Sequence, residues 1–202
     1  MMRVLAALGG WLVASTVCAA SPDLHEGDIV FQTSRSAQSV AVQRATGSRY
    51  SHMGVVMLRD GRPFVLEAAG TVQYTPWSEW VARGVGGHVV VKRLKNARDV
   101  LTPEAAQRFR QSARSFEGRP YDLTFEWSDD RLYCSELVWK LYQRAVGVEI
   151  GALQQIKDFK LDDPAVKQKM KERYGDHVPL QEPVISPVAM FESPQLMVVM
   201  ER

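Results

Sequence analysis

Two apolar runs joined by an Asp-Gly turn constrain the fold of this 202-residue chain more than any other feature. The runs cover residues 52–58 and 63–69, and the Asp-Gly pair occupies residues 60–61. Asp-Gly is strongly preferred in a two-residue β-hairpin turn because both turn residues need positive φ angles. A turn of this kind pairs Arg59 with Arg62 and fixes the partner of every residue further along. The sequence therefore predicts an antiparallel hairpin of defined register.

That register brings two ionisable side chains to one face of the hairpin. Gly54 falls opposite Glu67, so His52 and Glu67 become diagonal neighbours, about 7–8 Å apart at their backbones. Gly54 has no β-carbon and leaves room for the carboxylate to lean towards the imidazole. A carboxylate in an otherwise apolar strand is rarely left without a partner. We expect a His52–Glu67 pair; the alternatives are a solvent-facing Glu67 on an edge strand, or a one-residue slip that separates the pair.

The remaining pattern mixes strands and helices. Further strands are expected at residues 27–32, 72–75, 88–94 and 196–200. Helices are expected at residues 36–46, 76–82, 103–117 and 134–146, and from residue 165 onward. Thr102 is the expected cap of one helix, and Asp129 or Asp130 the expected cap of the helix that carries Cys134. This order predicts an α+β fold in which an antiparallel, barrel-like sheet packs against helices.

The charge balance and the N-terminal segment limit the classes of function that the chain can have. The 25 basic residues nearly balance the 23 acidic ones, so nucleic-acid binding has no support. Arg3, an apolar run over residues 4–17 and small residues at 18–20 form the layout of a secretory signal peptide. We therefore expect residues 1–20 to be removed, leaving no membrane-spanning segment. Residues 21–202 then form a single domain.

Cys134 is the only cysteine beyond the predicted signal peptide, so it has no partner for a disulfide within its own chain. It shares a helix face with Val138, Leu141 and Ala145, which directs it towards the core. It also lies in the first turn of its helix, where the macrodipole and free N–H groups favour a thiolate. Two interpretations stay open from the residue alone: a small buried hydrophobe or a nucleophile.

The chain offers four histidines as partners for that thiol. His25 and His177 are expected in solvated positions, and His88 at the start of a strand. His52 is the best candidate for a base because the hairpin supplies it with a carboxylate. Tyr121 lies thirteen residues before the cysteine and could bring a phenolic donor to the same site. A turn tyrosine packed on the helix is the alternative.

Two motifs link these residues to a known family. Residues 118–122 read Gly-Arg-Pro-Tyr-Asp, and residues 133–139 read Tyr-Cys-Ser-Glu-Leu-Val-Trp. In this combination the chain resembles the papain-like cysteine hydrolases of the NlpC type. Because His52 and Glu67 precede Cys134, the order matches the circularly permuted branch, and specifically the YiiX-like periplasmic proteins.

The resemblance implies a papain-like fold, a Cys134–His52–Glu67 triad and a periplasmic location, with Tyr121 matching the family's active-site tyrosine. Two departures from the wider superfamily bear on the substrate. Glu136 follows Ser135 where glycine is usual, and we expect it to narrow the pocket. Glu67 stands where a second histidine or an amide side chain is common. Cell-wall peptide cleavage is therefore not carried over to this chain.

These observations predict a cysteine hydrolase that cleaves an amide or ester bond through a thioester. The expected substrate is a small-molecule, lipid-derived or peptide amide, and no cofactor or metal is required. Three alternatives belong to other classes: an acyltransferase with the same triad, a catalytically inactive ligand-binding module of the same fold, and a metal site formed by His52, Glu67 and Cys134.

Overall fold

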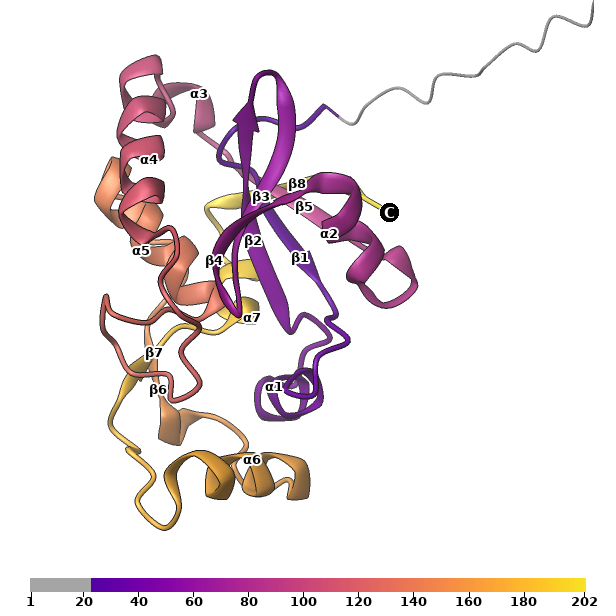
Figure 1. Cartoon of the computed structure of the whole chain (residues 1–202), viewed down its shortest axis with the longest axis vertical. Coiled ribbons are helices and arrows are strands. Elements are labelled where there is room, and N and C mark those ends of the chain that lie inside the picture. Colours follow the sequence, from indigo (N-terminus) through magenta and orange to yellow (C-terminus); the bar gives the residue numbers. More distant parts are fainter. Residues whose placement is uncertain (1–22) are drawn as a thin grey trace, which may run out of the picture.

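The chain folds around a six-stranded antiparallel sheet. In the computed structural model, which describes residues 23–202, the strands follow the order β4-β3-β2-β1-β5-β8 (Figure 1). The strands of this sheet are β1 (Ile29–Gln32), β2 (His52–Arg59), β3 (Arg62–Ala69), β4 (Thr71–Pro76), β5 (Val90–Leu94) and β8 (Leu196–Glu201). Two short strands, β6 (Gln154–Gln155) and β7 (Pro183–Val184), pair separately. The predicted signal peptide at residues 1–20 lies outside the described residues.

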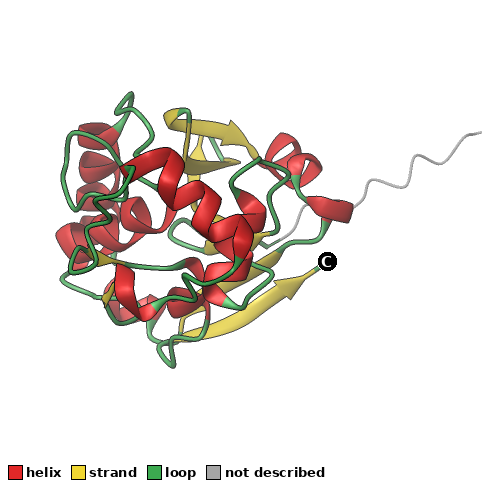
Figure 2. Cartoon of the chain, turned by 90° about the horizontal axis from the view of Figure 1, so that it is seen from below, coloured by secondary structure: helices red, strands yellow, loops and turns green. Residues whose placement is uncertain are grey.

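The helices lie mostly on one side of this sheet, as the view from below shows (Figure 2). Those of the described residues are α1 (Ser39–Thr46), α2 (Trp77–Arg83), α3 (Ala97–Val100), α4 (Pro103–Phe116), α5 (Cys134–Val146), α6 (Pro164–Tyr174) and α7 (Pro187–Phe191). No helix in residues 23–202 is long and apolar enough to cross a membrane. The mixed α+β fold with an antiparallel sheet confirms the predicted fold class.

The hairpin has the predicted register. Arg59 pairs with Arg62, and the pairing continues to Val55 opposite Leu66. The turn residues have positive φ angles, 50° at Asp60 and 72° at residue 61, as an Asp-Gly turn requires. Turn chemistry therefore determines which face of the sheet each hairpin side chain occupies.

The two faces of the sheet bury different sets of residues. One face packs under α4 and α5, where Met53 and Leu66 meet Leu137 in the main core. The other face packs under α2, where Val56 and Val65 surround the buried Trp80 in a smaller core. Alternating side chains of β2 and β3 thus serve both layers. The even-numbered residues of β2 and the odd-numbered residues of β3 face α2.

The cap of α5 differs from the prediction, although the helix itself covers the predicted residues. The helix begins at Cys134 and its N-cap residue is Tyr133, so the expectation of Asp129 or Asp130 as the cap is wrong. Glu136, two residues after Cys134, accepts a hydrogen bond from the Tyr133 N–H at 3.4 Å. The predicted cap of α4 is confirmed, because the Thr102 hydroxyl accepts from the helix backbone.

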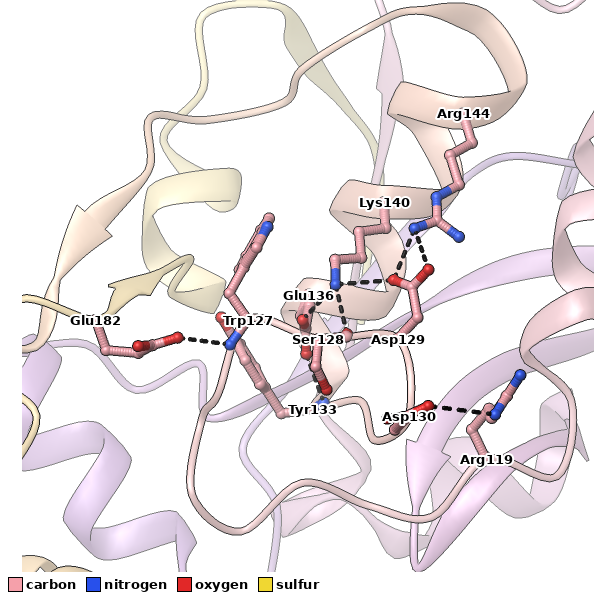
Figure 3. A network of polar contacts seen from close by, with 10 residues as sticks. All are labelled: Arg119, Trp127, Ser128, Asp129, Asp130, Tyr133, Glu136, Lys140, Arg144 and Glu182. Carbon is pink, nitrogen blue, oxygen red and sulfur yellow. Dashed lines mark hydrogen bonds and ion pairs between the residues drawn. The ribbon is translucent and has the colours of Figure 1, made fainter.

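The aspartates instead anchor the loop that leads into α5 (Figure 3). Asp129 accepts two hydrogen bonds from Arg144, at 2.6 and 2.7 Å, and one from the Lys140 ammonium at 3.1 Å. Lys140 also donates to the Ser128 carbonyl at 2.5 Å. These contacts fasten Ser128 and Asp129 against α5, whereas Asp130 lies 3.8 Å from Arg119. The first residue of the helix, Cys134, is held in place by that attachment.

Candidate active site

The hairpin and the start of α5 meet at one place. His52 is the first residue of β2, Glu67 lies near the end of β3, and Cys134 opens α5. The His52 Nε2 and Glu67 Oε2 atoms lie 2.6 Å apart, with the glutamate side chain fully buried and 12% of the histidine side chain exposed. The structure thus places the two charged partners that the hairpin register predicts in direct contact.

Glu67 accepts from three further side chains. Thr75 Oγ1 donates at 2.5 Å and Trp80 Nε1 at 3.1 Å, and the Arg83 guanidinium completes the set. Burial alone raises the pKa of Glu67, but the hydrogen bond and charge of His52, with Thr75 and Arg83, lower it below its ordinary value. Glu67 is therefore a fixed carboxylate, and the interpretation of a solvent-facing edge residue is wrong.

The surroundings of His52 favour its protonated form. Burial lowers its pKa, but the hydrogen bonds and negative charges of Cys134 and Glu67 outweigh that effect and raise the pKa to about 9. Nε2 is engaged by Glu67, so Nδ1 is the ring nitrogen that remains for another partner. The Trp80 ring stacks beside the imidazole, with centroids 6.1 Å apart. The imidazole has one orientation, set by Glu67 and Trp80 together.

Tyr121 lies next to the thiol and is positioned by Gln38. The Gln38 Nε2 donates to the Tyr121 hydroxyl oxygen at 2.9 Å, and Arg173 donates to the Gln38 Oε1 at 2.8 Å. Burial and the negative charge of Cys134 raise the pKa of Tyr121, so its proton stays on the oxygen. Because the hydroxyl oxygen already accepts from Gln38, its O–H is free to donate into the site.

Two neighbouring cavities lie at the site, one beside Cys134 and the other beside His52. An apolar cavity of about 110 Å³ is bordered by Cys134, and a larger polar cleft of about 540 Å³ is bordered by His52. Three residues border both spaces: Gln38, Ser51 and Tyr121. The thiol and the imidazole thus border two spaces that are joined through these three residues.

The other candidates from the sequence lie elsewhere. His25 contacts Asp23 at the surface, and His88 lies 4.0 Å from Glu201. Neither these two nor His177 borders the apolar cavity or the polar cleft. Glu136 borders neither space and instead lies 2.7 Å from Lys140, so the expectation that it narrows the pocket is wrong.

Four residues of the site are not predicted from the sequence: Gln38, Thr75, Trp80 and Arg83. Thr75, Trp80 and Arg83 donate to Glu67 from β4 and α2, and Gln38 donates to Tyr121 from the residue before α1. The local sequence pattern does not specify how these segments pack. Of these four, only Trp80 could have been suspected from the sequence, because a tryptophan in a short helix favours a buried position.

Gly54 allows β2 and β3 to approach closely beside this pair. A β-carbon at Gly54 would lie 2.5 Å from Val65 Cγ1 and 2.7 Å from the Leu66 carbonyl oxygen. Gly54→Ala is therefore expected to lower the free energy of unfolding by about 1–3 kcal/mol, measured by urea denaturation. Unchanged stability would contradict the close approach of the strands at this point.

The fold and much of the sequence are shared with a solved structure. A crystal structure described as metalloprotein YiiX from Escherichia coli O157:H7 superposes with a TM-score of 0.84 and 49% sequence identity. The match covers 89% of this chain and 98% of that one.

That structure is described as a metalloprotein, which raises the question of whether the residues of this chain fit a metal ion. Within residues 23–202, no three or more His, Cys, Asp and Glu side chains are grouped so that they could hold a metal ion. Both Glu67 oxygens already accept hydrogen bonds, one from Thr75 and Arg83 and the other from Trp80 and His52. The donor set around Cys134 therefore does not fit a metal centre.

Sequence comparison places the chain in a family. A curated relative, uncharacterized protein YiiX of Escherichia coli strain K12, is 50% identical over 173 residues, which is 86% of this chain and 84% of the relative. Residues 23–200 match the family model described as permuted papain-like amidase enzyme, YaeF/YiiX, C92 family. With this match over nearly all of the described residues, the chain belongs to the permuted papain-like amidase family.

Proposed function

We propose that this protein is an exported, periplasmic cysteine amidase in which Cys134, His52 and Glu67 act as a catalytic triad. The observation that carries the proposal is a buried carboxylate in direct contact with an imidazole whose pKa is raised by that carboxylate and by Cys134, the first residue of a helix. Membership of the amidase family supports the reaction class. The predicted signal peptide at residues 1–20 supports the location.

The nucleophile is the Cys134 thiolate, formed when its proton passes to His52. The free N–H groups at the start of α5 stabilise the negative charge on sulfur, and the adjacent imidazolium stabilises it further. The sulfur attacks the carbonyl carbon, and a C–S bond forms as the carbonyl oxygen takes up negative charge.

Two donors are available to that oxygen. The N–H of Cys134 has no acceptor within its own helix, since the first residue of an α-helix lacks a preceding turn. The Tyr121 hydroxyl supplies the second hydrogen bond, because Gln38 orients it and leaves its proton free. Donors fixed in a buried site stabilise developing charge more strongly than water does.

The intermediate collapses as His52 gives its proton to the leaving nitrogen and the C–N bond breaks. Water then attacks the thioester, with His52 as the base, and the C–S bond breaks to release the acid and restore the thiolate. Glu67 stays charged throughout and holds the imidazole orientation, as the third member of such triads does.

Alkylation of Cys134 tests the triad without a known substrate. At about pH 6, iodoacetamide is expected to label the native protein at least about 10-fold faster than the His52→Ala variant, because the imidazolium favours the thiolate. His52 loses its proton as the pH rises through about 9. The difference in labelling rate between the native protein and the His52→Ala variant is therefore largest at acidic pH and disappears above about pH 9.

Mass spectrometry of the labelled peptide measures both rates. His88→Ala provides the matched control, since His88 borders neither cavity, and it is expected to label like the native protein. Equal labelling of the native protein and His52→Ala at all pH values would rule out an activated thiol and with it the proposed mechanism.

A further inference from the structure

The cavity beside Cys134 and the cleft beside His52 have different linings. The smaller cavity is lined mainly by aliphatic side chains from α1, α6 and the segment around β7, among them Ala41, Ala45, Val166, Met170, Val184 and Ile185. Its two basic residues are already engaged: Lys169 pairs with Glu172, and Arg173 donates to Gln38. The interior of this cavity therefore suits an uncharged aliphatic group.

The larger cleft is polar and carries positive charge. Its lining includes Arg35 and Arg83 together with serine and glutamine side chains, and no acidic residue. Arg83 is paired with Glu67, whereas the exposed Arg35 makes no ion pair with any residue in the range 23–202. The cleft therefore suits a group that carries negative charge.

The chemistry assigns one half of the substrate to each space. The carbonyl carbon must lie at Cys134, which borders only the apolar cavity, so the acyl chain continues into that cavity. The leaving nitrogen must receive its proton from His52, which borders only the polar cleft. The leaving amine therefore lies in the cleft, within the field of Arg35.

From this arrangement we infer that the substrate is an N-acyl amino acid, with a short aliphatic acyl group and a carboxylate on the amine. The inference rests on the proposed amidase function and names its substrate class. In the reaction the acyl C–N bond breaks, a C–S bond to Cys134 replaces it, and the nitrogen takes the His52 proton. Water then releases the short-chain carboxylic acid, so the products are that acid and a free amino acid.

The size of the apolar cavity limits the acyl chain. Its volume is about 110 Å³, whereas a dry apolar cavity of about 150 Å³ holds a benzene ring. By this comparison the space holds about four to five carbon atoms beyond the carbonyl, so hexanoyl is the longest acyl group expected to fit. Ala41 and Ala45, one turn apart on α1, provide that space because their side chains are small.

Binding to the Cys134→Ala variant tests the assignment without turnover. Isothermal calorimetry with N-hexanoyl-alanine, N-acetyl-alanine and N-hexanoyl-alaninamide is expected to show at least about 10-fold tighter binding of N-hexanoyl-alanine than of either other compound. Adding Ala45→Leu is expected to remove the preference for hexanoyl over acetyl. Adding Arg35→Ala is expected to remove the preference for the carboxylate over the amide.

Two matched variants serve as controls. Val40→Leu enlarges an outward-facing residue of the same helix, and Arg44→Ala removes a charge that borders neither cavity at Cys134. Both are expected to keep the two preferences. Equal binding of all three compounds would overturn the inference about the substrate.

The same compounds distinguish this inference from the amidase proposal. If the native protein hydrolyses amides in a Cys134-dependent way without the two preferences, the amidase function stands and the substrate class is wrong. If the preferences appear in binding but the native protein hydrolyses none of the compounds, the two spaces are assigned correctly and the amidase function is wrong.

Discussion

Replacing Cys134 with alanine is expected to lower kcat/KM for amide hydrolysis by at least about 10⁴-fold, the largest effect of any single substitution in this protein. The proposed reaction has no other route to the acyl-enzyme, because Cys134 is the only cysteine outside the predicted signal peptide. His52, Glu67 and Tyr121 stay in place in this variant, yet none of them supplies a nucleophile. The loss is measured with N-acyl amino acids under conditions of low substrate concentration.

The fold must survive for this result to be informative. Cys134 is 5% exposed and borders a cavity, so removal of its sulfur leaves little additional empty volume. The variant is therefore expected to unfold within a few degrees of the native protein. Activity in the Cys134→Ala variant equal to that of the native protein would eliminate the thioester mechanism.

The hairpin shows how far local chemistry predicts this site. The Asp-Gly turn needs only its own two residues to adopt positive φ, so its register depends on nothing distant. Register in turn decides which side chains share a face, and this is why the contact between His52 and Glu67 follows from the sequence. The catalytic roles of the two residues stay predictions until activity is measured.

The surroundings of Glu67 follow from tertiary packing and not from a local pattern. Thr75 reaches the carboxylate from β4, and Trp80 and Arg83 reach it from α2. The periodicity of α2 predicts a helix but does not say which face of the sheet it covers. The apolar cavity escapes prediction for the same reason, since α1 and α6 are separated by more than a hundred residues of sequence.

The start of α5 shows a different limit of prediction. Asp129 and Asp130 have good capping chemistry, and the sequence offers no sign that a better partner exists. Lys140 and Arg144, on the next turns of the helix, attract Asp129 more strongly than free backbone N–H groups do. A charge pair across a loop thus overrides the local preference, and Tyr133 becomes the cap residue in place of the aspartates.

Replacing Lys140 with methionine is expected to cost about 3–5 kcal/mol of the free energy of unfolding, because it leaves Glu136 buried without its partner. The two side chains are 6% and 0% exposed and lie 2.7 Å apart. Arg144→Met is the matched control on the same helix. Its pair with Asp129 is largely solvated, so its loss is expected to cost about 0–1 kcal/mol.

The cost of Lys140→Met is expected to depend on pH in a defined direction. Burial raises the pKa of Glu136 to about 7 even though Lys140 lowers it, so the folded protein holds this proton more tightly than the unfolded chain. A carboxyl with a raised pKa stabilises the fold least at high pH, where the buried group must carry its charge. Without Lys140 the pKa rises further, and the destabilisation is larger at about pH 8 than at about pH 5.

Urea denaturation at these two pH values measures the difference, and the double variant Glu136→Gln/Lys140→Met isolates its cause. If the uncompensated charge is responsible, removing it recovers most of the lost stability and abolishes the pH dependence. A loss in Lys140→Met no larger than in Arg144→Met would show that the buried pair contributes no more than a surface contact. The first turn of α5 carries both Cys134 and Glu136, so this ion pair stabilises the same helix turn that holds the thiol.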